Sequence, residues 1–157
     1  MLHYIKGDLL EVKNGIIGHG VNYQGAFGSG VALGIKNKYP SVYKAYRRAV
    51  EQSHDKGSLL GMVQLVNTKP DGIYDPNEDT VLVANIFTQM NHGKDGKRYL
   101  DYEALYVGFE KLYNRSSMYG LPLCIPKIGC GLAGGDWGIV SVMIEKAYPK
   151  DVYVYEL

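Results

Sequence analysis

The stretch GIIGHGVNYQGAFGSGVA, residues 15–32, decides the fold of this chain. Its first six residues, 15–20, form an apolar run that predicts a β-strand. A glycine-rich loop follows, and Val31 and Ile35 then mark a short helix. That helix has to end before Pro40, because the residue that precedes a proline disfavours the α conformation. A strand, a loop and a helix in this order are typical of an α/β protein.

The alternation of strands and helices continues along the rest of the chain. Apolar runs bounded by turn residues predict further strands at residues 2–6, 62–66, 81–87, 121–126 and 152–155. Apolar side chains at helical spacing predict further helices at residues 41–52, 102–113 and 139–147, with Ser41 capping the first and Asp136 the last.

Six strands and four helices in alternation predict a three-layer α/β/α sandwich with a mixed, largely parallel six-stranded sheet. Residues 67–80 contain the turn signals Pro70-Asp71-Gly72 and Asp75-Pro76-Asn77, which predict a hairpin-like connection between strands three and four. The chain has no internal repeat and no linker, so residues 1–157 are expected to form a single domain. Binding sites in such sheets gather at the carboxyl ends of the strands.

The composition is that of an ordinary globular domain. Of the 157 residues, 46% are apolar and 21% are charged, which excludes disordered chains, fibres and coiled coils. The formal net charge of +1 argues against a general nucleic-acid coat protein. No apolar run is long enough to span a bilayer, and no leader segment is visible, so a cytoplasmic location without a membrane partner is expected. Cys124 and Cys130 are expected to be reduced thiols that hold no zinc.

The glycines are the informative part of the composition. They number 20 of the 157 residues, roughly 13% against about 7% on average, and they cluster in two loops, at residues 25–30 and 128–135. Each loop follows a predicted strand and leads into a predicted helix. Glycine lets the backbone approach an anion closely, and a helix N-terminus offers unpaired N–H donors and a partial positive charge. The two loops together predict a diphosphate site that needs neither a lysine nor a metal ion.

The glycine-rich loops also allow simpler interpretations. Either loop by itself could be a flexible connection. Neither contains the Gly-Lys-Ser/Thr sequence of a P-loop. Gly28, Gly30 and Gly34 faintly match a dinucleotide-binding fingerprint, but no acidic residue ends a strand about 20 residues later.

Three polar side chains lie at predicted strand ends near the loops. Asp8 follows the first strand, where its carboxylate could accept a hydrogen bond from an exocyclic amine or cap a turn. Asn22 follows the second strand, where its amide could bind a ribose hydroxyl or form an Asn turn. His19 ends the second strand and is either a packed structural histidine or a group that transfers a proton near neutral pH.

Three segments together carry a resemblance to a known family. They are Gly7-Asp8-Leu9-Leu10, Asn22 followed by Phe27-Gly28-Ser29-Gly30-Val31-Ala32, and Pro126-Lys127-Ile128-Gly129-Cys130-Gly131-Leu132. They resemble the macrodomain family of ADP-ribose-binding modules. The resemblance extends over almost the whole chain and is strongest toward the branch that contains fungal and phage-type ADP-ribose-1''-phosphate phosphatases.

The resemblance implies a role for each part of the site. Asp8 would accept a hydrogen bond from the adenine amine, and Leu9, Tyr155 and Leu157 would border the adenine. At the reacting end, Asn22 would bind the distal ribose, and His19 would activate water or protonate the leaving ribose oxygen. The diphosphate and the distal ribose would be held by Gly28, Ser29, Gly30 and Val31 from the first loop and by Ile128, Gly129, Cys130, Gly131, Leu132 and Ala133 from the second.

Two positions depart from relatives that cleave glycosidic bonds. Relatives that remove ADP-ribose from glutamate or from thymidine in DNA carry a lysine after the fourth strand, where this chain has Gln89. The glutamate-specific relative also carries an aspartate where this chain has Ala133. Lys94 and Lys97 are the lysines that could substitute.

The resemblance therefore implies an enzyme that hydrolyses the terminal phosphate of ADP-ribose-1''-phosphate without a metal or another cofactor. Two alternatives stay open, a non-catalytic reader of ADP-ribose and a hydrolase that removes ADP-ribose from protein or nucleic acid. ADP-ribose or its 1''-phosphate is the expected partner, and nucleic acid is expected only as an ADP-ribosylated substrate. A monomer in the cytoplasm is expected, which for a viral protein would be the cytoplasm of the host.

Overall fold

A mixed six-stranded sheet forms the centre of the protein in the computed structural model, which describes residues 1–28, 30–90, 100–131 and 133–157. The order of the strands across the sheet is β1-β6-β5-β2-β4-β3, and every neighbouring pair is parallel except β3 and β4. The predicted sheet and the predicted hairpin-like connection are thereby confirmed. The strands span Leu2–Lys6 (β1), Gly15–Asn22 (β2), Val63–Asn67 (β3), Val81–Gln89 (β4), Leu123–Ile125 (β5) and Val152–Glu156 (β6).

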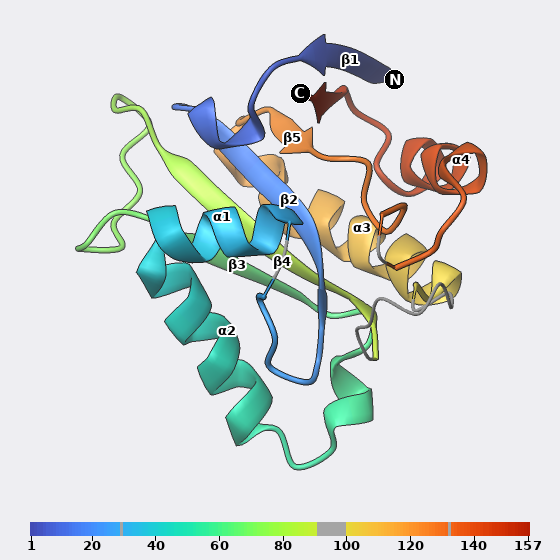
Figure 1. Ribbon diagram of the computed structural model, residues 1–157. Helices are drawn as coiled ribbons and strands as arrows, with labels where there is room; N and C mark the ends of the chain where they lie inside the picture. Colours follow the sequence, from blue (N-terminus) through green and yellow to red (C-terminus); the bar gives the residue numbers. More distant parts are fainter. Residues whose placement is uncertain (29, 91–99, 132) are drawn as a thin grey trace.

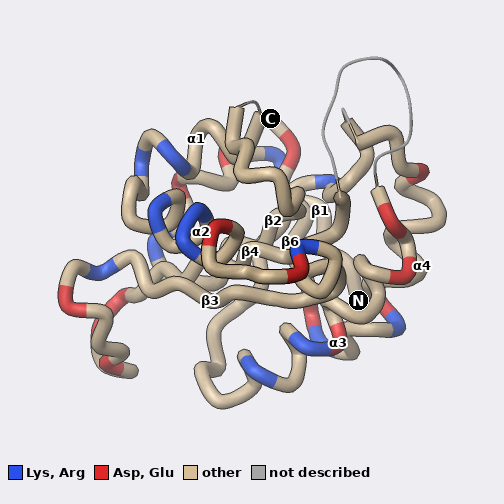
Figure 2. The backbone as a smooth tube through the Cα atoms, turned by 90° about the horizontal axis from the view of Figure 1, so that it is seen from below, with Lys and Arg blue, Asp and Glu red and all other residues tan. Residues whose placement is uncertain are grey.

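Helices cover both faces of the sheet, which confirms the predicted three layers (Figure 1). Helices α1 and α2 lie over one face, and α3 and α4 lie over the other. Basic positions gather on α1 and α2 (Figure 2). The helices span Gly30–Lys38 (α1), Pro40–Gln52 (α2), Tyr102–Ser116 (α3) and Trp137–Ala147 (α4), and short 3-10 helices span Leu9–Glu11, Lys56–Leu59 and Ser117–Tyr119. Within the described residues, no helix combines the length and the apolar character that crossing a membrane requires.

The central strand β2 divides the apolar core into two halves. Successive side chains of a strand point to opposite faces of the sheet. Ile16 therefore packs with side chains of α3 and α4, and Ile17 packs with side chains of α1 and α2. Both are fully buried. Burial on both faces explains why this strand does not alternate between apolar and polar residues: apolar residues and glycines fill it, apart from the buried side chains of His19 and Asn22.

Two boundaries differ from the sequence-based expectation. Strand β2 continues to Asn22, so His19 lies inside the strand and Asn22 is its last residue. Helix α2 begins at Pro40, one residue before Ser41, and no side chain caps it. The prediction that Ser41 caps this helix was therefore wrong. Proline suits the first helical position because its φ is already helical and its missing N–H would have had no partner there.

The cap of α4 agrees with the prediction. The carboxylate of Asp136 accepts a hydrogen bond from the backbone N–H of Gly138 over 2.8 Å. Residue Asp136 thereby joins the second glycine-rich loop to α4, because the carboxylate satisfies a donor that the helix itself leaves unpaired.

We expect Asp136→Ala to lower the free energy of unfolding by about 1 kcal/mol, because loss of an N-cap has this typical cost. Urea unfolding followed by circular dichroism would measure the change. Asp136→Asn is the matched control, since an asparagine keeps the accepting oxygen. Equal losses in the two variants would show that the cap is not the cause.

Candidate functional site

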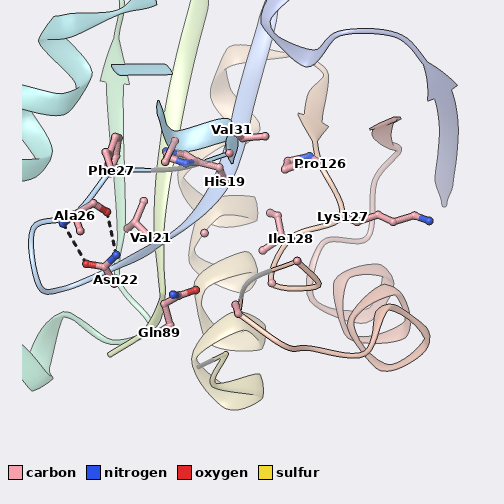
Figure 3. Close-up of a pocket in the computed structure, with 17 residues that line it drawn as sticks. His19, Val21, Asn22, Ala26, Phe27, Val31, Gln89, Pro126, Lys127 and Ile128 are labelled. Atoms are coloured by element: carbon pink, nitrogen blue, oxygen red, sulfur yellow. Dashed lines mark hydrogen bonds between the residues drawn. The ribbon is translucent and has the colours of Figure 1, made fainter. Parts of the chain in front are cut away.

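A cavity of about 460 Å³ opens at the edge of the sheet where the parallel strands β2, β4 and β5 end (Figure 3). Both glycine-rich loops line it. They reach the same edge because parallel strands have all their carboxyl ends on one side. Of the residues predicted to form the site, those that line the cavity are His19, Asn22, Gly28, Gly30, Val31, Ile128, Gly129, Gly131 and Ala133.

The side chain of Asn22 shapes the first loop. Its Oδ1 atom accepts hydrogen bonds from the backbone N–H of Gln24 over 2.9 Å and of Ala26 over 3.4 Å. Its Nδ2 atom donates to the carbonyl of Ala26 over 3.0 Å. The loop is therefore an Asn turn, one of the two roles expected for this residue. The Nδ2 group has a second hydrogen, which makes no hydrogen bond to the described residues.

The hydroxyl group of Tyr46, on α2, forms hydrogen bonds with this turn. Its hydroxyl lies 2.8 Å from the carbonyl oxygen of Asn22 and 2.9 Å from Oδ1 of the same residue, and it accepts a hydrogen bond from the N–H of Gly25 over 3.0 Å. Burial raises the pKa of Tyr46 to about 12, so the hydroxyl keeps its proton near neutral pH. The first loop is thus tied to a helix that lies outside the cavity.

Phe27 and Arg47 complete the support of the first loop. The ring of Phe27 is buried against Tyr46, with 4.3 Å between the ring centroids. The guanidinium of Arg47 donates to the carbonyl of Gly25 over 3.1 Å. Gly25 has a φ of +87°, a conformation that L side chains rarely adopt, and an added Cβ would overlap the Arg47 guanidinium. Sequence reasoning missed the role of Phe27 in the cavity, although its place in the glycine motif was visible.

Helix α1 begins at the cavity. Gly30, Val31 and Ala32 form its first turn, and all three line the cavity. The first N–H groups of a helix have no partner inside the helix, and the helix dipole makes this end partly positive. The arrangement can therefore bind an anion with backbone donors. Ser29, also predicted to contact the diphosphate, lies outside the described residues.

The second loop lines the cavity with Gly129, Gly131 and Ala133, and it turns sharply at Gly129. Gly129 has a φ of +74°, and its carbonyl accepts from the N–H of Gly135 over 2.6 Å. The N–H of Leu100 donates to the carbonyl of Ala133 over 3.1 Å. An added Cβ at Gly129 would lie 2.7 Å from the side chain of Leu100, so the close packing of the loop requires glycine there. Leu132 of this loop lies outside the described residues.

Lys127 is a cavity residue that the sequence did not place there. Its ammonium group points away from the cavity (Figure 3) and lies 2.5 Å from a carboxylate oxygen of Glu156. The other lining residues outside the predicted set are Gly20, Val21, Ala26, Phe27, Ala32, Gln89 and Pro126. The lysine is therefore directed toward Glu156 and not toward the centre of the cavity.

His19 lies in the wall of the cavity and is 2% exposed. Its Nε2 atom lies 2.6 Å from Oδ1 of Asn85. Burial lowers the pKa of His19 from 6.5 to about 4, and the hydrogen bond to Asn85 only partly opposes this shift. The imidazole is therefore neutral near pH 7. A neutral imidazole can accept a proton or a hydrogen bond, but it is a poor source of a proton for a leaving oxygen.

Five residues predicted to contact the ligand do not line this cavity. Asp8 is exposed and caps the 3-10 helix that follows β1, by accepting from the N–H of Leu10 over 2.9 Å. This is the capping role that the sequence left open. Leu9 is buried in the core under α1. Leu157 is 93% exposed, and the remaining two are Cys130 and Tyr155.

Cys130 has no feature of a nucleophile. Burial raises the pKa of its thiol, and a reactive cysteine needs a lowered one. Its Sγ atom lies 3.2 Å from the carbonyl of Ile128. The described part of the chain contains no group of three or more His, Cys, Asp or Glu side chains that could hold a metal ion.

The chain is similar in sequence and in fold to known proteins. An ADP-ribose 1''-phosphate phosphatase of Candida glabrata is 32% identical, with 99% of this chain and 98% of that protein aligned. The macrodomain of Thermus aquaticus DarG has the same fold with a TM-score of 0.76, at 26% identity over 100% of this chain and 99% of that one. The chain belongs to the macrodomain family. No family model matches it.

This macrodomain is also similar to proteins that are named for a glycohydrolase activity and not for a phosphatase activity. A DNA ADP-ribosyl glycohydrolase of Thermus aquaticus is 29% identical over 99% of this chain, which spans 41% of that longer protein. The two positions that depart from such relatives, Gln89 and Ala133, both line the cavity of this macrodomain. Lys94 and Lys97 lie outside the described residues.

We expect Tyr46→Phe to lower the free energy of unfolding by about 1–3 kcal/mol, because the variant leaves the buried N–H of Gly25 without its acceptor and removes the hydroxyl donor that faces the oxygens of Asn22. Urea unfolding would measure the loss. Tyr43→Phe is the matched control, since Tyr43 packs in the same aromatic cluster and has only its ring in the described contacts. An equal loss in both variants would contradict the assigned role of the Tyr46 hydroxyl.

Proposed function

We propose that this macrodomain binds ADP-ribose-1''-phosphate and hydrolyses its terminal phosphate. The observation that supports the proposal most directly is that two glycine-rich loops, distant in the sequence, line one cavity. A volume of about 460 Å³ is within the range of small-molecule sites. The likeness to fungal ADP-ribose 1''-phosphate phosphatases over nearly the whole chain points to the same substrate.

The diphosphate would lie between the two loops. One phosphate would accept hydrogen bonds from the first turn of α1, and the other from backbone N–H groups of the second loop. The Nδ2 group of Asn22 would reach the distal ribose. Asp8, Leu9, Tyr155 and Leu157 would border the adenine beyond the described cavity, at the carboxyl ends of β1 and β6. In this proposal residues 1–157 act as a single macrodomain.

In the proposed reaction a water oxygen bonds to phosphorus while the bond between phosphorus and the 1''-oxygen of the ribose breaks. The products are inorganic phosphate and ADP-ribose. Backbone N–H groups of the loops would stabilise the negative charge that spreads over the phosphoryl oxygens. His19 would accept a proton from the attacking water through Nδ1, since its pKa of about 4 keeps it unprotonated. The leaving oxygen would take its proton from solvent.

Cleavage of a glycosidic bond is the less favoured enzymatic activity. The resemblance places a lysine and an aspartate in relatives with this activity, and here the same positions are Gln89 and Ala133, both in the cavity wall. Neither side chain can supply a charge to the reacting carbon. A non-catalytic reader stays the second candidate, because Nδ1 of His19 is buried and a ligand reaches it only if its neighbours give way.

We expect purified protein to release inorganic phosphate from ADP-ribose-1''-phosphate, and His19→Ala to lower kcat by about a hundredfold, the usual effect of losing a proton-transfer group. Phosphate release and calorimetric binding of ADP-ribose would be measured together. Binding without phosphate release would identify a reader. Unchanged turnover in His19→Ala would remove the role given to this residue. Release of ADP-ribose from ADP-ribosylated DNA or protein, with no phosphate release, would favour the glycohydrolase activity.

We expect Gly28→Val to weaken ADP-ribose binding at least about tenfold while the ligand-free protein keeps its melting temperature. The reason is that a Cβ at Gly28 would meet no atom within 4 Å among the described residues beyond its chain neighbours, whereas a ligand in the cavity would contact it. Thermal unfolding with and without ADP-ribose would show both effects. A variant that gains as much stability from ADP-ribose as the wild type does would disprove contact between the ligand and this loop.

A further inference from the structure

A row of three polar side chains crosses the sheet behind the cavity. His19 on β2 and Asn85 on β4 are direct register partners, and Asn85 is also the register partner of Gln64 on β3. Nε2 of His19 lies 2.6 Å from Oδ1 of Asn85, and Nδ2 of Asn85 donates to Oε1 of Gln64 over 3.0 Å. We call these three residues the polar row.

The polar row lies on the face of the sheet that α1 and α2 cover, and it ends on α2. Nε2 of Gln64 donates to the backbone carbonyl of Ala45 over 3.0 Å. Asn85 is fully buried, and its apolar neighbours on β4, Val83 and Phe87, belong to the core on this face. Polar side chains in such a place cost free energy of desolvation, which their hydrogen bonds have to offset.

The carbonyl of Ala45 sets the direction of every hydrogen bond in the polar row. A carbonyl only accepts, so the atom of Gln64 that faces it is the NH₂ group, and the other end of that amide is an oxygen. This oxygen requires a donor, so the NH₂ group of Asn85 faces it. The remaining oxygen of Asn85 then faces His19. Orientations of amide groups are ordinarily ambiguous, but here a backbone group decides both.

His19 must consequently carry its proton on Nε2. An oxygen of Asn85 only accepts, so Nε2 donates to it, and Nδ1 of the neutral ring has a free lone pair. Among the described residues, no group makes a hydrogen bond to this buried Nδ1 atom. Within the described part of the chain, the polar row thus ends at an unpaired atom, Nδ1 of His19, and His19 is the member of the row that lines the cavity.

We infer that Asn85 and Gln64 are positioning residues, which hold His19 in the Nε2–H form so that the buried Nδ1 atom, once the side chains that cover it give way to the ligand, accepts a hydrogen bond from an O–H group in the cavity. That O–H group belongs to the distal ribose of the ligand or to the attacking water. The inference rests on the proposed function for its reaction, but the proton position on His19 follows from the polar row alone. Neither positioning residue lines the cavity, so each acts through His19.

The first test reads the proton position directly. Long-range ¹H–¹⁵N NMR spectra of the wild-type protein near pH 7 distinguish the two neutral forms of each imidazole, and His19→Ala identifies the signals of His19 among the four histidines. We expect the Nε2–H form. The Nδ1–H form, or a mixture of the two, would overturn the inference whether or not the protein is an enzyme.

Three variants test the roles of the positioning residues in the same spectra. Asn85→Leu and Gln64→Leu remove the directional restraint, so we expect a mixture of the two neutral forms. Asn85→Asp keeps an oxygen opposite Nε2, so we expect Nε2 to stay protonated. Asn67→Ala is the matched control, because Asn67 lies on β3 and, among the residues that the structure describes, its side chain bonds to the local N–H of Lys69 alone. A pure Nε2–H form in Gln64→Leu would exclude Gln64 from the mechanism.

Ligand binding and kinetics test the accepting role of Nδ1. Saturation with ADP-ribose should move the ¹⁵N signal of Nδ1 more than that of Nε2. For a protein that releases phosphate, Gln64→Leu should lower kcat about tenfold or more, with KM changed less than about threefold, and Asn67→Ala should change neither. An unmoved Nδ1 signal in saturated protein would refute the contact. Absence of phosphate release would refute the proposed function and leave the NMR result to decide this inference.

Discussion

Parallel pairing of β2 with both of its neighbours, β5 and β4, is the constraint on which the site depends. Because all three strands run in the same direction, their carboxyl ends open at one edge, and the loops that follow β2 and β5 meet there (Figure 1). The strand between them is buried on both faces, which fixes its register and so the position of each residue that follows. The core therefore fixes where both loops begin, and the hydrogen bonds of the loops set the rest of the cavity wall.

The cavity has few charged groups in its described lining, although it is proposed to hold a diphosphate. Lys127 points outward to Glu156, and His19 is neutral because burial lowers its pKa to about 4. Recognition would therefore rely on backbone N–H groups and on the dipole of α1. Such donors belong to the backbone, so the fold itself holds them in place. The same principle requires rigid loops, and Tyr46 supplies that rigidity to the first loop from α2.

Much of the architecture could be predicted from local patterns. The order of the strands and helices, the β3–β4 hairpin and the Asp136 cap follow from apolar periodicity, turn residues and capping preferences, which act over a few neighbouring residues. The wrong prediction that Ser41 caps α2 has the same local origin. Pro40 and Ser41 are both residue types that favour a helix start, and the helix begins at Pro40. His19 was predicted at the end of the second strand and Asn22 just after it; β2 continues to Asn22, so His19 lies inside the strand and Asn22 is its last residue.

The sequence by itself determined that two glycine-rich loops follow strands and that the chain resembles a macrodomain. Only the tertiary structure decided what the polar residues do, because their partners lie far along the chain. Asn22 bonds to Tyr46, and His19 bonds to Asn85, which is 66 residues away. Hydrogen bonds between residues so far apart in the sequence depend on how the strands and helices pack. Strand order and register place His19 opposite Asn85, and no pattern of neighbouring residues indicates this pairing. The proton position on His19 is the clearest case, since a carbonyl on a helix fixes it through two amide side chains.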